Sequence, residues 1–350
     1  MSKSLRIGTR DSQLAVWQAT LVQDELKKQG IASELVYIKS DGDIDLVTPL
    51  YEMGVQGVFT KTLDAALLSN RIDIAVHSMK DVPTQLAQGL MQAAVLPRAS
   101  HADVLAFKEE KSGVWRLEPG ADDKNNTVDY SLRTTHHPPF SIHHTKPQTQ
   151  NTKLQTPNPK PQTLTIATSS VRRKAQWLHR YPHHRIENLR GNVNTRLQKV
   201  QDNNWDGAIF AAAGLERIGL RPSSAVDLDW MLPAPTQGII MIACRENDLD
   251  VLNACTPLNN EATAICAQLE KDFLRQLMGG CATPISALAE WKDGNIVFRG
   301  SILSLNGEEK IEIEGEIPAS EANAAGVRAA QLLMENGARN IINAIRNAGL

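Results

Sequence analysis

The sequence predicts an α/β fold with largely parallel sheets, followed by a small α+β domain. Through residues 1–245, short apolar runs that suit buried strands alternate with amphipathic stretches of helical period, which is typical of α/β units. The last third differs, because two strand-like runs around an Asn306-Gly307 turn precede a long amphipathic helix from about residue 319. At 350 residues the chain is long enough for two or three such domains.

The elements of the α/β part follow in order along the chain. The first strand, LRIGT, precedes a predicted helix whose apolar residues are Leu14, Trp17, Leu21 and Leu26. The later strand-like runs are IDIAVHS, LTIATSS, GAIFAAAG and GIIMIAC. Each is short and apolar, as expected of strands buried in a parallel sheet.

A further helix is predicted upstream of an unusual cysteine. It begins at the cap residues Asn259 and Asn260 and ends at Gly279. Cys281 then follows two glycines and precedes Pro284, which favours a defined but open loop just past the helix end. An unpaired cysteine is also commonly a small buried hydrophobe, and the loop alone leaves both interpretations open.

The composition changes between residues 107 and 164. The stretch from about 121 to 162 is rich in Thr, Asn, Gln, His and Pro and has few core-forming residues, so we expect a disordered insertion. Its two His-His pairs are an alternative metal-binding feature, but no Cys lies nearby and we expect no metal site.

Charge and targeting features exclude several classes of protein. The net charge is −2, which gives no overall attraction to nucleic acid or anionic lipid. The N-terminus lacks the apolar core of a signal peptide, and no run of about 18 apolar residues is present to span a bilayer. The cysteines form no CxxC pair. We therefore expect a cytoplasmic protein with reduced thiols.

Polar residues follow several predicted strands, at the edge where open α/β sheets bind ligands. The helix starts there add backbone N–H donors that favour an anionic ligand. The polar residues at these junctions are Arg10, Ser12, Ser78, Lys80, Asp81, Thr168, Ser169, Ser170, Arg172 and Arg173.

The basic residues continue through residue 196, with Arg190 and Arg196 near a Gly-containing turn. A solvated helix face and a nucleic-acid patch are alternatives, but the arginines recur at turns and aromatic residues for base stacking are scarce. The planar guanidinium suits carboxylates or phosphates, and no GxxxxGK[ST] loop is present, so we expect a ligand with several carboxylates. Asp81 is the exception in this basic setting, either an ion-pair partner or a group that handles protons.

Seven motifs, in order, resemble those of the porphobilinogen deaminase family, also called hydroxymethylbilane synthases. They are RIGTRDSQLAVWQA, DIAVHSMKDVPT, ATSSVRRKAQ, LRGNVNTRL, AAAGLERIGL, PTQGIIMIACR and LMGGCATPI. The resemblance covers almost the whole chain apart from the polar insertion. It implies a transferase that joins four porphobilinogen molecules head to tail, releases ammonia each time, and hydrolyses the product to hydroxymethylbilane in tetrapyrrole (haem) synthesis.

The resemblance also implies roles for individual residues. Cys281 would carry a covalent dipyrromethane cofactor, and Asp81 would be the carboxylate that assists ammonia loss and stabilises cationic intermediates. Phe59 would be a lid residue, whereas Gln56 and Thr62 depart from the lysine and glutamate usual in that segment. The cofactor and substrate contacts would be Arg10, Ser12, Ser78, Lys80, Thr168, Ser169, Ser170, Arg172, Arg173, Arg190, Arg196 and Arg217.

The family fold implies two α/β domains like those of type II periplasmic binding proteins around a cleft, plus a C-terminal α+β domain that bears the cysteine loop. In this chain the first domain would comprise residues 1–100 and 235–256, the second 101–234 and the third 257–350. The family is generally monomeric, and its partner is the small molecule porphobilinogen rather than nucleic acid or membrane. A competing interpretation is a non-catalytic cleft-type binding protein for a polycarboxylate.

Overall fold

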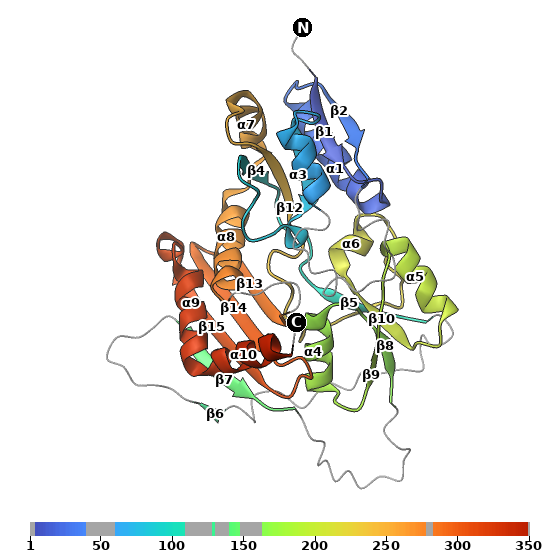
Figure 1. Cartoon of the computed structure of the whole chain (residues 1–350), viewed down its shortest axis with the longest axis vertical. Helices are drawn as coiled ribbons and strands as arrows, with labels where there is room; N and C mark the ends of the chain where they lie inside the picture. The colour runs from blue at the N-terminus through green and yellow to red at the C-terminus, as the bar shows by residue number, and fades with distance from the viewer. Residues whose placement is uncertain are drawn as a thin grey trace.

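The computed structural model describes residues 4–39, 60–108, 128–129, 140–147, 163–277 and 283–348. These residues form three five-stranded sheets, each with helices packed against it (Figure 1). The predicted fold class, two α/β units with a C-terminal α+β unit, is confirmed. The exact domain boundaries stay a prediction.

The first sheet has the strand order β2-β1-β3-β12-β4. Strand β1 is parallel to β2 and β3, whereas β12 is antiparallel to β3 and β4. In that order the strands span Ser33–Tyr37, Leu5–Thr9, Ile74–Ser78, Ile240–Arg245 and Leu90–Val95. The helices that pack on this sheet are α1 (Gln13–Lys28), α3 (Lys61–Leu68) and α7 (Leu249–Cys255).

Alternate side chains of β12 enter two separate cores, as expected of a strand with both faces covered. Ile240 and Ile242 pack with residues of α1 and α7, and Met241 and Ala243 pack with residues of α3. This explains why the GIIMIAC segment is apolar at every position rather than at alternate ones.

The second sheet repeats the plan of the first, with the order β9-β8-β10-β5-β11. Strand β8 is parallel to β9 and β10, and β5 is antiparallel to β10 and β11. In that order the strands span Arg185–Glu187, Thr165–Ala167, Gly207–Ala211, Asp103–Phe107 and Val226–Asp227. The helices around it are α4 (Val171–Arg180), α5 (Val193–Asp202) and α6 (Ala212–Glu216).

The chain passes twice between these sheets, because β5 follows β4 of the first sheet and β12 follows β11 of the second. The two connections are hydrogen-bonded together: the amide of Leu96 donates to Ile240 O at 3.0 Å and that of Ala99 to Gly238 O at 3.1 Å. At Gly238, where φ is 87°, an added Cβ would lie 2.7 Å from the carbonyl oxygens of Ala99 and Ser100. Only glycine permits so close an approach.

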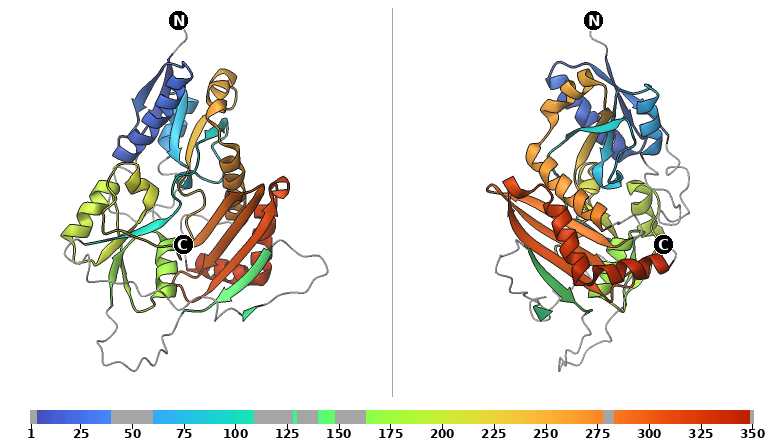
Figure 2. Two further views of the ribbon diagram at one scale, coloured as in Figure 1. Left: turned by 180° about the vertical axis from the view of Figure 1, so that it is seen from behind. Right: turned by 60° about the vertical axis from the view of Figure 1, so that its left-hand side comes forward.

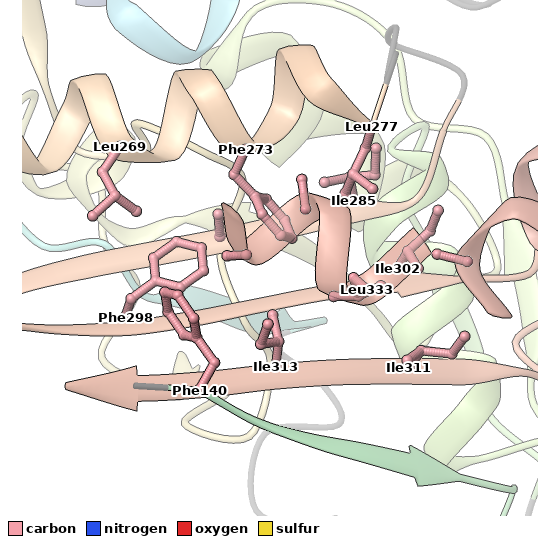
Figure 3. Close-up of a cluster of buried hydrophobic side chains, with 14 of the residues drawn as sticks. Phe140, Leu269, Phe273, Leu277, Ile285, Phe298, Ile302, Ile311, Ile313 and Leu333 are labelled. Carbon is pink, nitrogen blue, oxygen red and sulfur yellow. The ribbon is translucent and has the colours of Figure 1, made fainter. Parts of the chain in front are cut away.

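The third sheet has the order β13-β14-β15-β7-β6 and is antiparallel throughout. Its helices lie on one face, and Figure 3 shows the apolar side chains between the layers. In that order the strands span Ile285–Lys292, Asn295–Leu303, Lys310–Pro318, Phe140–Thr145 and Val128–Asp129. The helices are α8 (Glu261–Gln276), α9 (Ala325–Leu333) and α10 (Arg339–Asn347).

Most predicted elements are confirmed, including helix α8, which is capped by Asn260, whose side chain accepts a hydrogen bond from Thr263 N at 2.9 Å. The prediction of one long C-terminal helix is wrong. Gly337 has φ of 105° and separates α9 from α10, since a left-handed residue cannot continue a right-handed helix. Short helical turns occupy Met79–Asp81 (η1), Thr256–Leu258 (η4), Ala319–Glu321 (η5) and Met334–Ala338 (η6).

The prediction of a disordered insertion over 121–162 is wrong for residues 140–145. They form β7, which pairs with β15 from Lys310↔Thr145 to Gly315↔Phe140 (Figure 2). Phe140 is buried and meets the ring of Phe298 edge-on at 6.1 Å. The alternation of Phe140 and Ile142 with polar residues suits a strand on the edge of a sheet with one covered face. The rest of the insertion, apart from 128–129 and 146–147, lies outside the described residues.

Within the described ranges, no helix is long and apolar enough to cross a membrane.

Candidate active site

A cavity of about 410 Å³ opens between the first two sheets and collects most of the predicted site residues. Residues that follow β1 and β3 line one side, and residues around α4, α5 and α6 line the other. The predicted residues that line it are Arg10, Ser12, Ser78, Lys80, Asp81, Thr168, Ser169, Ser170, Arg172, Arg173 and Arg196. Their convergence follows from the strand order, because the carboxyl ends of neighbouring parallel strands meet at one edge of a sheet.

On the first side, backbone turns place a carboxylate at the cavity. Ser12 caps α1 by accepting from Ala15 N at 3.4 Å, and Ser78 Oγ accepts from Gln18 Nε2 at 2.9 Å. The turn η1 follows directly and presents Lys80 and Asp81. Asp81 makes no ion pair with any described residue, so the salt-bridge interpretation of this carboxylate has no support in this structure.

On the second side, three hydroxyl residues shape the loop before α4. Thr168 Oγ1 accepts from Ser170 N at 3.2 Å, Ser169 Oγ donates to Leu189 O at 2.6 Å, and Ser170 caps α4 by accepting from Arg173 N at 3.4 Å. The N-terminus of the ten-residue α4 therefore begins at the cavity wall. Its backbone N–H groups favour a negatively charged ligand there.

Arg172 and Arg173 share one buried carboxylate, that of Asp103 at the start of β5. Arg172 Nη2 and Arg173 Nη2 each lie 2.7 Å from an oxygen of Asp103. Arg172 Nη1 also donates to Leu232 O at 2.7 Å, and Arg173 Nη1 to Ile209 O at 2.9 Å. Burial alone would raise the pKa of Asp103, but the two guanidinium groups hold it well below its usual range.

The arginines still have donor capacity toward the cavity. The Nε atoms of Arg172 and Arg196 are buried and have no hydrogen-bond partner among the described residues. Burial, and then the charge of Arg173, lowers the pKa of Arg196 to about 10, which leaves it charged at neutral pH. Two unsatisfied N–H groups and a surplus of positive charge fit a ligand that brings carboxylates.

Lys80 reaches across the cavity to the connection between the sheets. Its Nζ donates to Gln237 Oε1 at 3.2 Å. The side chain is accessible from the cavity, yet the protein around it limits its hydration. This desolvation, and then the charge of Arg173, lowers the pKa of Lys80 to about 8, against the opposing effect of Asp81 and Asp103.

Two predicted contacts are not among the residues that line the cavity. Arg190 is buried, and its carbonyl accepts from Lys199 Nζ at 3.2 Å. Arg217 donates from Nη2 to Gly238 O at 2.7 Å, and its guanidinium lies 5.8 Å from the ring centre of Trp17. Cys281, Phe59 and Gln56 lie outside the described residues, and Thr62 is in α3.

Sequence reasoning missed Asp103 and gave no role to Gln237. The available sequence signal was an acidic residue directly before the apolar run VLAF, and the structure shows Asp103 fully buried. Gln237 was part of the PTQG motif but resembled any polar turn residue. Their contact joins positions far apart in sequence, which no local pattern indicates.

The three cysteines within the described residues are buried, unlike a thiol on an open loop. Cys244, Cys255 and Cys266 are free and buried, and burial raises the pKa of Cys255 to about 12 and that of Cys266 to about 11. Such thiols are poor nucleophiles at neutral pH. Among the described residues, no group of three or more His, Cys, Asp or Glu is arranged to hold a metal ion, and the absence of a metal site stays a prediction.

Comparison with known proteins gives near full-length matches. The family description "Porphobilinogen deaminase, dipyromethane cofactor binding domain" matches residues 5–122 and 144–253, and "Porphobilinogen deaminase, C-terminal domain" matches 264–335. The chain is 35% identical over 348 residues to the porphobilinogen deaminase of Syntrophotalea carbinolica, covering 98% of this chain and 96% of that protein. It is 36% identical over 352 residues to that of Acidithiobacillus ferrooxidans, covering 99% and 100%.

Among solved structures, a double-mutant form of the VFT2 domain of Bordetella pertussis BvgS matches with a TM-score of 0.37 and 10% identity, over 73% of this chain and 86% of that one.

Proposed function

Because the chain belongs to the porphobilinogen deaminase family, we propose that Cys281 carries a covalent dipyrromethane cofactor and that Asp81 is the catalytic carboxylate. The chain is a transferase of tetrapyrrole synthesis that acts on the small molecule porphobilinogen. It joins four substrate molecules head to tail with loss of ammonia and hydrolyses the product to hydroxymethylbilane. The alternative of a non-catalytic polycarboxylate-binding protein is not favoured.

The cavity residues suit the proposed cofactor and substrate. Each porphobilinogen brings an acetate and a propionate, so a tethered chain of pyrroles is a polyanion. The unpartnered Nε groups of Arg172 and Arg196 supply donors for such carboxylates. Arg10, Ser12, Lys80 and the residues at the start of α4 would hold further carboxylates. Arg190 and Arg217 do not line the described cavity and stay proposed contacts of the cofactor or substrate.

Asp81 is placed to handle charge rather than to bind an anion. When bound, the dipyrromethane supplies the primer to which substrate units are added. At each addition, the Asp81 carboxylate would stabilise the positive charge that appears on the substrate as ammonia leaves, and would accept and return the proton at its carboxylate oxygen. Arg172, Arg173 and Arg196 line the same cavity as this carboxylate and would bind the carboxylates of the substrate while Asp81 faces its cationic centre.

Cys281 is proposed as the attachment point on chemical grounds. The other three cysteines are buried with little thiolate at neutral pH, whereas Cys281 follows two glycines in the sequence and lies in the motif that resembles the family's attachment site. Phe59, which lies outside the described residues, is proposed as a lid residue from the family resemblance. A cytoplasmic location and a monomeric state stay predictions from the sequence.

Intact-protein mass spectrometry tests the proposal. The wild-type protein should carry a two-pyrrole adduct that maps to Cys281, and Cys281→Ser should be folded, unmodified and nearly inactive, since a hydroxyl is a far weaker nucleophile than a thiol. Cys255→Ala serves as the matched control and should load normally. A wild-type protein without an adduct, or a loaded Cys281→Ser variant, contradicts the assignment.

A further inference from the structure

We propose that Gln237 is a positioning residue, which holds the Lys80 ammonium beside Asp81 and is itself fixed by Asp103. This inference rests on the proposed function of the cavity and deepens it. Neither Gln237 nor Asp103 belongs to the predicted set of ligand contacts. Gln237 touches the cavity, whereas Asp103 lies behind the arginines and acts through them.

The hydrogen bonds of Gln237 permit one orientation of its amide. Nε2 donates to His101 O at 2.8 Å and to Asp103 Oδ1 at 2.9 Å. Both partners are acceptors, so the opposite orientation would place Oε1 against a carbonyl and a carboxylate. The oxygen must therefore face the other way, where Lys80 Nζ lies 3.2 Å from it. Gln237 is 1% exposed, so bulk water does not compete for these contacts.

Through its location, Gln237 connects residues of both α/β sheets. His101 belongs to one connection between the two α/β sheets, Asp103 begins the strand β5 at its end, and Gln237 belongs to the other connection. Lys80 follows a strand of the first sheet, while Arg172 and Arg173 begin a helix of the second. One amide thus links the turn that presents Asp81 to the carboxylate that holds both arginines, and it sets the positions of cations on opposite walls of the cavity.

Asp103 also adjusts the charge of Lys80. The charged groups that influence the ammonium are Arg172 and Arg173, which disfavour its charge, and Asp81 and Asp103, which favour it. Removing the Asp103 charge takes away one of the two carboxylates that oppose the arginines, and so lowers the pKa of Lys80 further. Removing Gln237 Oε1 takes away an acceptor of the charged form and acts in the same direction.

The test compares Gln237→Met with Gln176→Met, after intact mass has shown the two-pyrrole adduct in each. Gln176 is a matched control, because it is also buried and bridges Leu232 O and Ser286 Oγ without touching Lys80. We expect kcat/KM for porphobilinogen to fall by about 10² in Gln237→Met, the scale that a misplacement of about 1 Å produces, and to change little in Gln176→Met. Both substitutions should change the thermal unfolding temperature by a similar amount.

The pH profile distinguishes positioning from support of the fold. The alkaline limb of kcat/KM, which reports groups of the free enzyme, should move to lower pH in Gln237→Met and in Asp103→Asn but not in Gln176→Met. If Gln237→Met does not fold, the pH profile of Asp103→Asn still tests the proposal. Loaded variants with the wild-type limb and kcat/KM overturn the positioning role, whereas a wild-type protein without the adduct overturns the proposed function instead.

Discussion

Asp81 is the acidic side chain at the cavity, and it has no ion-pair partner among the described residues. Asp103, by contrast, is fully buried and accepts from Arg172, Arg173 and Gln237. Two carboxylates in one region therefore have different tasks: one fixes the positions of cations, and the other is accessible to a substrate. The environment, rather than the residue type, separates these tasks.

Replacement of Asp81 tests this distinction directly. Asp81→Asn keeps the shape but removes the charge, so we expect the attached cofactor to survive while kcat falls by roughly 10² or more, as for loss of a positioned acid–base group. Intact mass and steady-state turnover measure the two effects separately. Wild-type turnover in a loaded Asp81→Asn protein would assign the carboxylate to structure alone.

The polar residues at strand ends predicted the location of this site. The sequence could not predict the residues that hold its side chains in place. Arg10, Lys80 and Arg172 follow short apolar strands, and parallel strands bring such residues to one edge. The pairing of Gln237 with Asp103 depends instead on two connections that run side by side, a tertiary arrangement that neither local stretch encodes. The family resemblance implied which residues would contact ligand but not which residues would hold those side chains in place.

Strand β7 lies within a segment whose average composition is too polar to predict a strand. Residues 121–162 are polar as a whole, yet Phe140 and Ile142 alternate within them and face the third core. The partner edge, β15, would otherwise present unpaired N–H and C=O groups, which are costly to leave uncovered beside an apolar face. Short-range alternation was the informative signal, and averaging over some forty residues removed it.

Phe140 should anchor this added strand. Its ring is 7% exposed and meets Phe298 edge-on. Phe140→Ala should lower the free energy of unfolding by about 3 kcal/mol, the lower end for loss of a buried aromatic ring. The exposed Ser141 on the same strand is the control, and Ser141→Ala should change stability by less than about 0.5 kcal/mol in urea unfolding. Equal stabilities of the two variants would show that β7 does not unfold with the third sheet.

Across the whole molecule, Glu270 connects the third unit to both connections between the first two. This α8 residue is 0% exposed. Its carboxylate lies 2.6 Å from Arg98 Nη2, on one connection, and accepts from Thr236 N, on the other, at 2.5 Å. It also accepts from Ala289 N of β13 at 2.6 Å. The left-handed Thr236, at φ of 61°, is unfavourable for a β-branched residue, and the Glu270 contact helps to hold it.

Removal of Arg98 should therefore weaken all three units together. Arg98→Met leaves the Glu270 charge buried and unpaired, and we expect the free energy of unfolding at neutral pH to fall by about 3–5 kcal/mol. Arg299→Met, which breaks the exposed pair of Arg299 with Glu290, is the control and should cost less than about 1 kcal/mol.

The pH dependence of the Arg98→Met effect has a definite sign. Burial already raises the pKa of Glu270 and Arg98 opposes that rise, so without Arg98 the carboxyl of the folded state takes up a proton at higher pH than it does when unfolded. The penalty is complete above the raised pKa and is relieved as pH falls toward the unfolded value, so the variant and wild-type stabilities should converge on acidification. Urea unfolding at a series of pH values measures this difference. A gap that stays constant or widens at low pH would mean that the unpaired charge of Glu270 is not the source of the loss, and that Arg98 contributes through packing of its side chain instead.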